Sequence, residues 1–298
     1  MSTRFDRLAL LKTFVRIAER GNLSGAARDL ETSQPSVSRQ LAALEARLGT
    51  VLARRTTHDV TLTPDGLTLL ADARRMLAEW EAIEERHQQE EALSGTLRVI
   101  APIALGQSLL MGPAAKFLKE HPDVQVEWKL RDGDLRFAEE GCDVWIKVGP
   151  VKDDTLIVRE LGKVERLVVG APSCVDEGHR TKVEELPWVT LGPFEGNRIE
   201  LFDSRGGSHQ FEVHPRLASD NIFAVSQAVR EGVGVAIMPS WFVANELESG
   251  ALIEVLPDFR APRLSVSLAI ASGTKRPRRV TSFCDAMEAW AAATLVGS

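Results

Sequence analysis

The strongest constraint on the fold is a run of three short helical segments within the first fifty residues. Apolar residues recur at helical spacing in segments 8–18, 24–30 and 37–48. Gly21 and Gly49 end the first and third segments, because glycine readily adopts the left-handed conformation that terminates a helix. This order predicts either a helix-turn-helix unit or an ordinary three-helix bundle with a polar outer face, and spacing alone does not separate the two.

The third segment carries residue types that read DNA. We expect Ser33 to cap it and Pro35 to lie in its first turn, where a missing N–H has no cost. Gln34 can pair with adenine and Arg39 with guanine in the major groove. The hydroxyl groups that suit phosphate contacts belong to Ser33, Ser36 and Ser38. We expect Ser24 to cap the preceding segment.

The charge distribution is compatible with double-stranded DNA as a partner. The chain has a net charge of −6, yet residues 1–63 hold ten Lys/Arg against six Asp/Glu. The remaining residues are therefore acidic, and a small basic head on an acidic body is expected when only the head touches phosphates. The excess is modest and carries little weight by itself.

The same region resembles a known family. Residues 26–30, 33–41 and 44–49 resemble the signature of LysR-type transcriptional regulators, and residues 54–57 and 60–66 resemble that family's wing and the start of its linker helix. The resemblance is uninterrupted over about sixty residues, which is far more specific than an isolated helix-turn-helix pattern. It implies that Gln34, Pro35, Ser36 and Arg39 face bases, and that the DNA backbone is held by Ser33, Ser38 and Arg55.

Two residues depart from the family pattern. Ala53 stands where the family usually has Phe, and His58 where it usually has Arg. We expect a less tightly packed wing from the first and a weaker phosphate contact at neutral pH from the second.

A long helix is expected over residues 64–92, with Thr63 as its cap and Pro64 in its first turn. Its apolar stripe alternates at spacings of four and three, as in a coiled-coil seam, and consists of Leu69, Ala73, Met76, Trp80 and Ile83. So short a seam often belongs to a helix packed on its own domain. In the resembled family its partner is the same helix of a second subunit, which favours a homodimer or homotetramer.

From residue 93 onward, strands alternate with helices, which implies an open α/β sheet. Two such units, joined by crossing strands at about 156–163 and 263–269, resemble the LysR effector domain, itself similar to periplasmic binding proteins. The expected fold is thus an all-α winged helix-turn-helix (1–63), a linker helix (64–92) and a two-subdomain α/β effector domain (93–298). Subdomain I covers about 96–160 and 266–298, and subdomain II about 161–265.

Ligands of open α/β sheets sit beyond the carboxyl ends of strands, near free N–H groups of helices. The effector-binding residues expected on this basis are Pro102, Ile103, Ala104, Gln107, Lys147, Pro193, Asn221 and Phe223. Lys147 follows an otherwise apolar strand and should seek an anion, which points to a small carboxylate effector. An internal ion pair of Lys147 with Asp143 or Asp220 is an equally open interpretation.

Other function classes find little support. Motifs such as GxSxG, HExxH and the P-loop are absent, the six histidines lack metal-ligand spacing, and the three cysteines form no CxxC pair, so we expect no enzyme, metal or cofactor. No run has the character of a signal peptide or membrane span, which favours a cytoplasmic protein. We therefore expect a regulator of an interrupted palindrome, with RNA polymerase as a further partner. The alternative is a stand-alone small-molecule-binding protein whose helical head serves only dimerisation.

Overall fold

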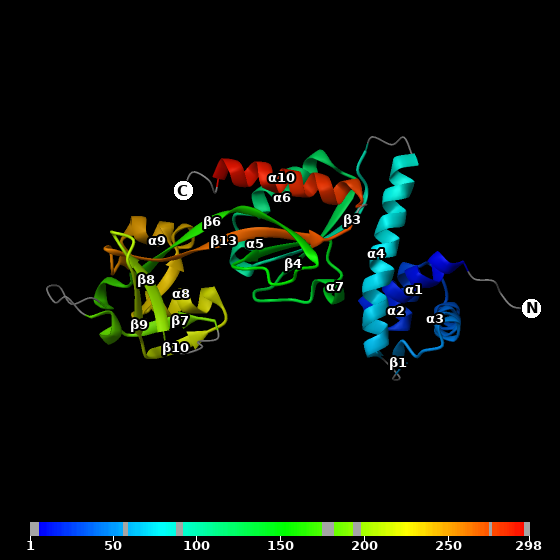
Figure 1. Ribbon diagram of the computed structural model, residues 1–298, viewed down its shortest axis with the longest axis horizontal. Helices are drawn as coiled ribbons and strands as arrows, with labels where there is room; N and C mark the ends of the chain where they lie inside the picture. Colours follow the sequence, from blue (N-terminus) through cyan, green and yellow to red (C-terminus); the bar gives the residue numbers. More distant parts are fainter. Residues whose placement is uncertain are drawn as a thin grey trace, which may run out of the picture.

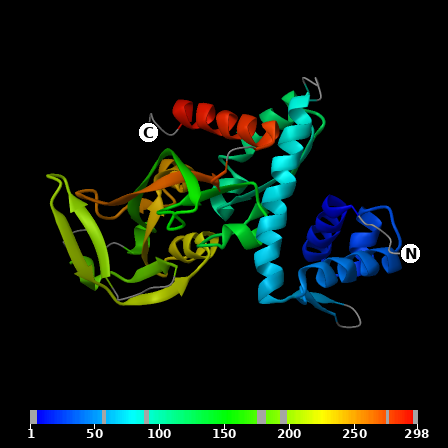
Figure 2. The ribbon, with the colours of Figure 1, turned by 45° about the vertical axis from the view of Figure 1, so that its right-hand side comes forward.

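The computed structural model describes residues 6–55, 59–87, 92–174, 182–192, 198–273 and 276–294. A small helical head and a larger α/β body lie on opposite sides of one long helix, α4 (Figure 1). Turning the molecule by 45° keeps the head and the body on opposite sides of this helix (Figure 2). The expected fold class, a winged helix-turn-helix followed by a linker helix and an α/β domain, is confirmed.

The head is a three-helix unit with a two-stranded wing. Its elements are α1 (Arg7–Arg20), α2 (Leu23–Asp29), α3 (Gln34–Leu48), β1 (Ala53–Arg55) and β2 (Val60–Leu62). Ser33 caps α3 as expected, with its side chain accepting the N–H of Ser36. The expectation for α2 was wrong, because Asn22 and not Ser24 caps it by accepting the N–H of Gly25 at 2.6 Å. Both side chains are good caps, and the earlier position leaves Ser24 exposed on the first turn.

The wing is fastened to α3 by one carboxylate. Glu45 accepts the backbone N–H groups of Leu52 and Ala53 on its Oε1 atom, at 3.0 and 3.3 Å. Ala53 is buried, so the smaller side chain found here in place of the family's Phe still belongs to the head's core. A charge-assisted pair of hydrogen bonds thus positions the strand that follows α3.

The long helix α4 (Pro64–His87) begins on the wing. Thr63 caps it as expected, because its hydroxyl accepts the N–H of Gly66 at 3.0 Å. Gly66 lies so close to the carbonyl of Leu52 that a Cβ atom there would overlap the oxygen. Leu70 and Ala73 then pack into the core of the head, so head and linker helix share one apolar cluster.

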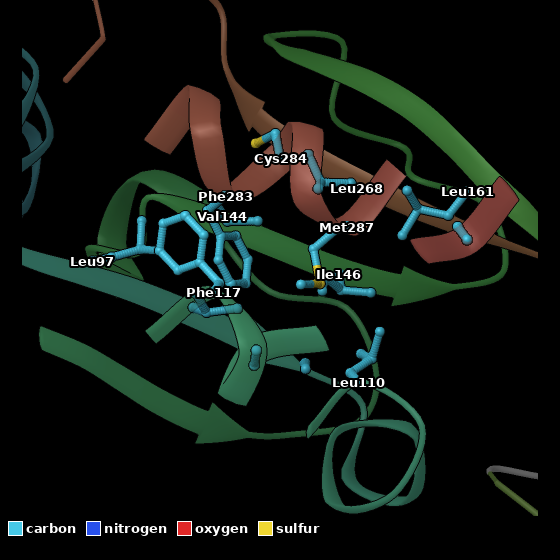
Figure 3. Close-up of a cluster of buried hydrophobic side chains, with 14 of the residues drawn as sticks. Leu97, Leu110, Phe117, Val144, Ile146, Leu161, Leu268, Phe283, Cys284 and Met287 are labelled. Carbon is cyan, nitrogen blue, oxygen red and sulfur yellow. The ribbon is translucent and has the colours of Figure 1, made fainter. Parts of the chain in front are cut away.

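The first half of the body is built around strands β3 (Gly95–Ala101), β4 (Val124–Leu130) and β5 (Val144–Val148). Its helices are α5 (Ile103–Gln107), α6 (Met111–Glu120), α7 (Phe137–Glu140) and α10 (Arg278–Thr294). Strands β4 and β5 both pair in parallel with β3. Figure 3 shows α10 lying over this sheet, where Phe283 meets Phe117 edge to face at 5.3 Å between ring centroids. Apolar residues from these strands and from α6 and α10 pack into one hydrophobic core.

Two long strands connect this half to the second. They are β6 (Leu156–Gly170) and β13 (Phe259–Ala271), which pair antiparallel with register shifts between Ala261 and Leu264 and between Val266 and Ser267. The strand order along the main path is β10-β7-β11-β6-β13-β5-β3-β4. Because the sheet runs through both halves, the crossing strands fix how the halves face each other (Figure 1).

The second half contains more strands than the sequence pattern indicated. Its elements are β7 (Trp188–Leu191), β8 (Arg198–Asp203), β9 (Ser208–Glu212), β10 (Pro215–Ser219), β11 (Val235–Pro239), β12 (Ile253–Glu254), α8 (Ile222–Arg230) and α9 (Ala244–Ser249). Short 3₁₀ turns cover Pro172–Cys174, Val183–Glu185 and Ser240–Phe242. The hairpin of β8 and β9 was not expected, since most of its residues are polar and exposed.

Candidate DNA-binding surface and effector cleft

Helix α3 lies on the outer side of the head (Figure 1), and the side chains of its amino-terminal half are polar and largely exposed. Gln34, Pro35 and Arg39 are exposed there, while Ser36 and Ser38 are half-buried. Arg39 is held loosely, with its Nε donating to the carbonyl of Pro35 at 3.4 Å. Its guanidinium is therefore available to a base edge without breaking an ion pair.

The opposite face of α3 is fixed in the head. Val37, Leu41 and Leu44 are buried in the head's core. Thr13 of α1 donates its hydroxyl hydrogen to Gln40 Oε1 at 2.8 Å, which ties α3 to α1 just behind the polar surface. Arg55 is in register with Val60 across the wing hairpin. His58, for which a weak phosphate contact was expected, lies outside the described residues.

The expected stripe on α4 divides into two parts. Ala73 is fully buried against the head of its own chain, and Leu69 packs on the same cluster, so both belong to the core of the head. Met76 and Trp80 remain exposed, at 51% and 39% of their surface, although both are large and apolar. Ile83 is half-buried. A helix that exposes Met and Trp one turn apart presents an apolar patch to solvent.

Polar contacts join α4 to the body. Arg74 donates to the carbonyl of Glu139 at 2.9 Å and also lies 3.8 Å from Glu19 of α1. Arg279 at the start of α10 forms an ion pair with Glu81 of α4. The linker helix is therefore in contact with the head and the body at once, through groups that are mostly shielded from solvent.

The body contains a cleft of about 750 Å³ between its two halves. It lies beyond the carboxyl ends of β3, β4, β5, β7, β10 and β11, the place where open α/β sheets bind ligands. Four of the expected effector-binding residues line it, namely Pro102, Ile103, Ala104 and Asn221. Residues from both halves form its walls, so a ligand here would touch both at once.

Lys147 does not line this cleft. Its neighbour Val148 does, and successive side chains of a strand point to opposite faces, so Lys147 points to the other side of β5. There it is buried, pairs with Asp134 and lies 5.0 Å from the centroid of the Trp145 ring. Burial and the nearby Lys152 both lower the pKa of Lys147. Lys147 is thus in an internal ion pair, although with neither of the two acids considered from the sequence.

Two further expected residues do not line the cleft, and a third is not among the described residues. Gln107 ends α5 and is exposed away from the cleft. Phe223 is 40% exposed and packs edge to face on Phe242, with the ring centroids 5.2 Å apart. Pro193 lies outside the described residues.

Several of the N–H groups expected to be free at the cleft already have a partner within the chain. Asn221 caps α8 by accepting the N–H groups of Phe223 and Ala224 on its own side chain. Asp132 accepts the N–H of Ile103 at 3.1 Å, at the start of the short α5. These N–H groups at the helix starts beside the cleft are therefore not available to a ligand.

The sequence pattern missed Arg166, Thr190 and Trp241, which all line the cleft. Thr190 Oγ1 and Trp241 Nε1 are buried without a hydrogen-bond partner in the described part of the chain. Arg166 lies on the crossing strand β6, and burial lowers the pKa of its guanidinium. The one sequence signal was a charged residue close to the apolar run 167–169 on a long strand.

No site for metal or thiol chemistry emerges from the described residues. They contain no group of three or more His, Cys, Asp or Glu side chains that could hold a metal ion. The three cysteines are free, and burial raises the pKa of Cys142 and Cys284 to about 12, so both are thiols at neutral pH. Within the same residues, none of the helices has the length and apolar character needed to span a bilayer.

Two family models match the chain. Residues 8–67 match the bacterial regulatory helix-turn-helix of the LysR family, and residues 90–292 match the LysR substrate binding domain. Among curated proteins, the HTH-type transcriptional regulator YhjC of Escherichia coli K12 is 32% identical over 294 residues, which cover 93% of this chain and 95% of YhjC.

Solved structures show the same architecture. The full-length virulence activator AphB of Vibrio cholerae, a member of the LTTR protein family, is 25% identical with a TM-score of 0.58, covering 95% of this chain and 98% of AphB. A full-length variant of OxyR from Pseudomonas aeruginosa has a TM-score of 0.72 at 18% identity, covering 94% and 97% of the two chains, and is similar in fold alone.

Proposed function

The chain belongs to the LysR family of DNA-binding transcriptional regulators with an effector-binding domain, and from this premise we propose that it binds an interrupted palindromic site through α3. The observation that carries the proposal is the polar and largely exposed amino-terminal half of α3. In the proposed complex Gln34, Pro35, Ser36 and Arg39 face bases. Ser33, Ser38 and Arg55 hold the phosphate backbone. The working division remains a DNA-binding head (1–63), a linker helix (64–92) and an effector domain (93–298).

Members of the family form oligomers, and here the proposed unit is a homodimer, or a tetramer made of such dimers. The exposed Met76 and Trp80 support this, since a second copy of α4 would bury both. Ile83 extends the same stripe by one turn. Two heads held by paired linker helices would meet two half-sites, which is why the DNA site is expected to be palindromic.

The effector is proposed to bind in the cleft between the two halves of the body. A ligand that binds better when the halves are closed shifts the population toward that arrangement. The contacts of Arg74 and Arg279 on α4 support transmission of this shift to the linker helix and so to the spacing of the heads. The protein is thus a sensor and not a catalyst, working in the cytoplasm with RNA polymerase as a further partner.

A gel-shift experiment with the DNA upstream of the gene for this chain tests the proposal. The full-length protein should shift that DNA at low salt and leave a shuffled sequence of equal length unshifted at the same concentration. Footprinting should show two protected half-sites separated by about one helical turn or a multiple of it. If a folded dimer binds no such DNA, the chain is instead a small-molecule-binding protein whose head serves dimerisation.

A further inference from the structure

The cleft is lined by one half-buried cation, Arg166, and by two donor atoms that are buried without a partner among the described residues. These lining residues come from three elements: Arg166 lies on β6, Thr190 on β7, and Trp241 in the 3₁₀ turn after β11. Thr190 is only 7% exposed. Since buried hydroxyl and indole N–H groups normally have partners, their lack of one in the described residues points to a bound molecule that completes them.

Hydrogen bonds orient the guanidinium of Arg166, but no carboxylate of the described residues neutralises its charge. Its Nε and Nη2 atoms both donate to the carbonyl of Pro262, at 2.8 and 2.5 Å. Pro262 lies where β13 shifts register between Ala261 and Leu264. These bonds use two of the five N–H donors of a guanidinium. No carboxylate of the described residues lies within ion-pair distance of Arg166, and the remaining donors have no acceptor in that part of the chain.

The other charged groups of the cleft limit the charge of the ligand. Arg131 is exposed and already pairs with Glu140, while Asp132 and Asp220 are exposed acids. Arg166 is therefore the cleft cation that no acid of the described residues neutralises, and its charge matches one negative charge on a ligand, while the two exposed acids disfavour a multiply charged anion. The cleft that Arg166 lines also has apolar walls, to which Trp188, Ile199, Ile237 and Leu264 contribute.

We propose that Arg166, with Thr190 and Trp241, binds the carboxylate of a small monocarboxylic acid whose apolar part lies against the tryptophan and aliphatic walls. The planar carboxylate matches the guanidinium fork, and the hydroxyl of Thr190 and the indole N–H of Trp241 donate to its remaining lone pairs. The inference rests on the proposed effector role of the cleft. The ligand is still a carboxylate, as expected from the sequence, but the cation that recognises it is Arg166 and not Lys147.

Matched probes test the charge requirement. Benzoate and benzamide, and hexanoate and hexanamide, have nearly the same shape in each pair and differ in charge. Thermal denaturation of the full-length chain at pH 7 should show a dose-dependent rise of Tm with at least one acid and a smaller rise with its amide. Arg166→Gln should weaken binding of that acid by roughly 10- to 100-fold, because it removes a charge-assisted hydrogen bond.

Control variants separate this site from other cations. Arg131→Gln removes the exposed cation at the cleft, and Lys147→Met removes the buried cation on the other face of β5; both should keep the preference for the acid. Thr190→Val keeps the side-chain shape and should raise the Tm of the ligand-free chain while weakening binding of the acid. This variant remains informative even if Arg166→Gln folds poorly.

The proposal is overturned if no acid raises Tm more than its amide, or if Arg166→Gln and Thr190→Val keep the full preference. Gel shifts on the same preparations distinguish the two ideas. If the chain binds no DNA but still prefers the acid to its amide, the proposed DNA binding is wrong and the proposed carboxylate site remains supported. If the chain binds DNA but shows no preference for the acid, the proposed DNA binding is supported and the carboxylate site is wrong.

Discussion

Arg279 at the start of α10 and Glu81 in the middle of the linker helix form an ion pair of 2.7 Å that joins the effector domain to α4. The Arg279 side chain is only 10% exposed, and its Nε also donates to the carbonyl of Thr96 on β3 at 2.9 Å. Glu81 is 43% exposed. The arginine is therefore held in the body by a second hydrogen bond, whereas the carboxylate of Glu81 is open to solvent.

We predict that substitutions at Arg279 and Glu81 lower the free energy of unfolding by unequal amounts. Arg279→Met should lower the free energy of unfolding by about 1–3 kcal/mol, since it leaves the Thr96 carbonyl without its donor. Glu81→Gln should cost less than about 1 kcal/mol, because a half-exposed ion pair is screened by solvent. Urea denaturation measures both. Glu120→Gln, in an exposed pair with Lys116, is the control and should change nothing measurable. Equal losses at Arg279 and Glu81 would contradict this asymmetry.

A second prediction concerns the proposed base reader. Arg39 is exposed on α3 with one weak contact, so Arg39→Ala should leave the fold intact. It should reduce affinity for the specific site by about 1–3 kcal/mol, and for random DNA by much less. Arg55→Ala, proposed to remove a phosphate contact, should weaken both about equally and flatten the salt dependence. Equal losses for Arg39→Ala on the two DNAs would remove its base-reading role. Fluorescence anisotropy at several salt concentrations provides the comparison.

The head could be predicted from the sequence because its signals are local. Apolar spacing, a serine before Gln34 and glycines after the first and third helices each act within one or two turns. The same local rules left one ambiguity, since Asn22 and Ser24 are both good caps and only the chain's path decides between them. In the hairpin of β8 and β9, only β8 shows an apolar alternation, with Ile199 and Leu201 buried, and it is too short to reveal the hairpin beside the polar and mostly exposed β9.

The cleft could be predicted only in outline. Its position beyond the strand ends follows from the topology of α/β sheets, and so does the lining role of residues 102–104. The side to which Lys147 points depends on the register of β5, and a shift of one residue reverses it. Arg166 comes from a strand that crosses between the halves, and its partner Pro262 is 96 residues away in the sequence. Contacts of that range leave no local signal.

A charged side chain at Trp80 tests whether the apolar stripe of α4 is the dimer interface. Trp80 and Met76 lie one turn apart on the same face of α4 and are exposed in the single chain. Trp80→Glu should therefore produce monomers and abolish operator binding while the effector domain stays folded. Arg75→Glu introduces the same side chain on a different face of α4 and should leave the dimer intact. Sedimentation at micromolar concentration distinguishes the two, and a dimeric Trp80→Glu protein would show that the main interface lies elsewhere.

The junction between wing and linker helix should not tolerate a side chain at Gly66. A Cβ atom there would overlap the carbonyl of Leu52, which also accepts a hydrogen bond from the N–H of Thr63. Gly66→Ala should thus force the first turn of α4 off the wing and lower the free energy of unfolding by about 1–3 kcal/mol.

Gly112→Ala is the matched control for that substitution. Gly112 lies in the first turn of α6, and apart from its chain neighbours nothing lies within 4 Å of the position its Cβ would take. Because Pro113 follows it and offsets the gain in helix propensity, alanine there should change the free energy of unfolding by less than about 0.5 kcal/mol. A large loss at Gly66 beside a small change at Gly112 would attribute the loss at Gly66 to the contact with Leu52. If both variants stabilise the chain, the wing moves freely enough to accept a methyl group, and the position of the head on α4 is not set by this contact.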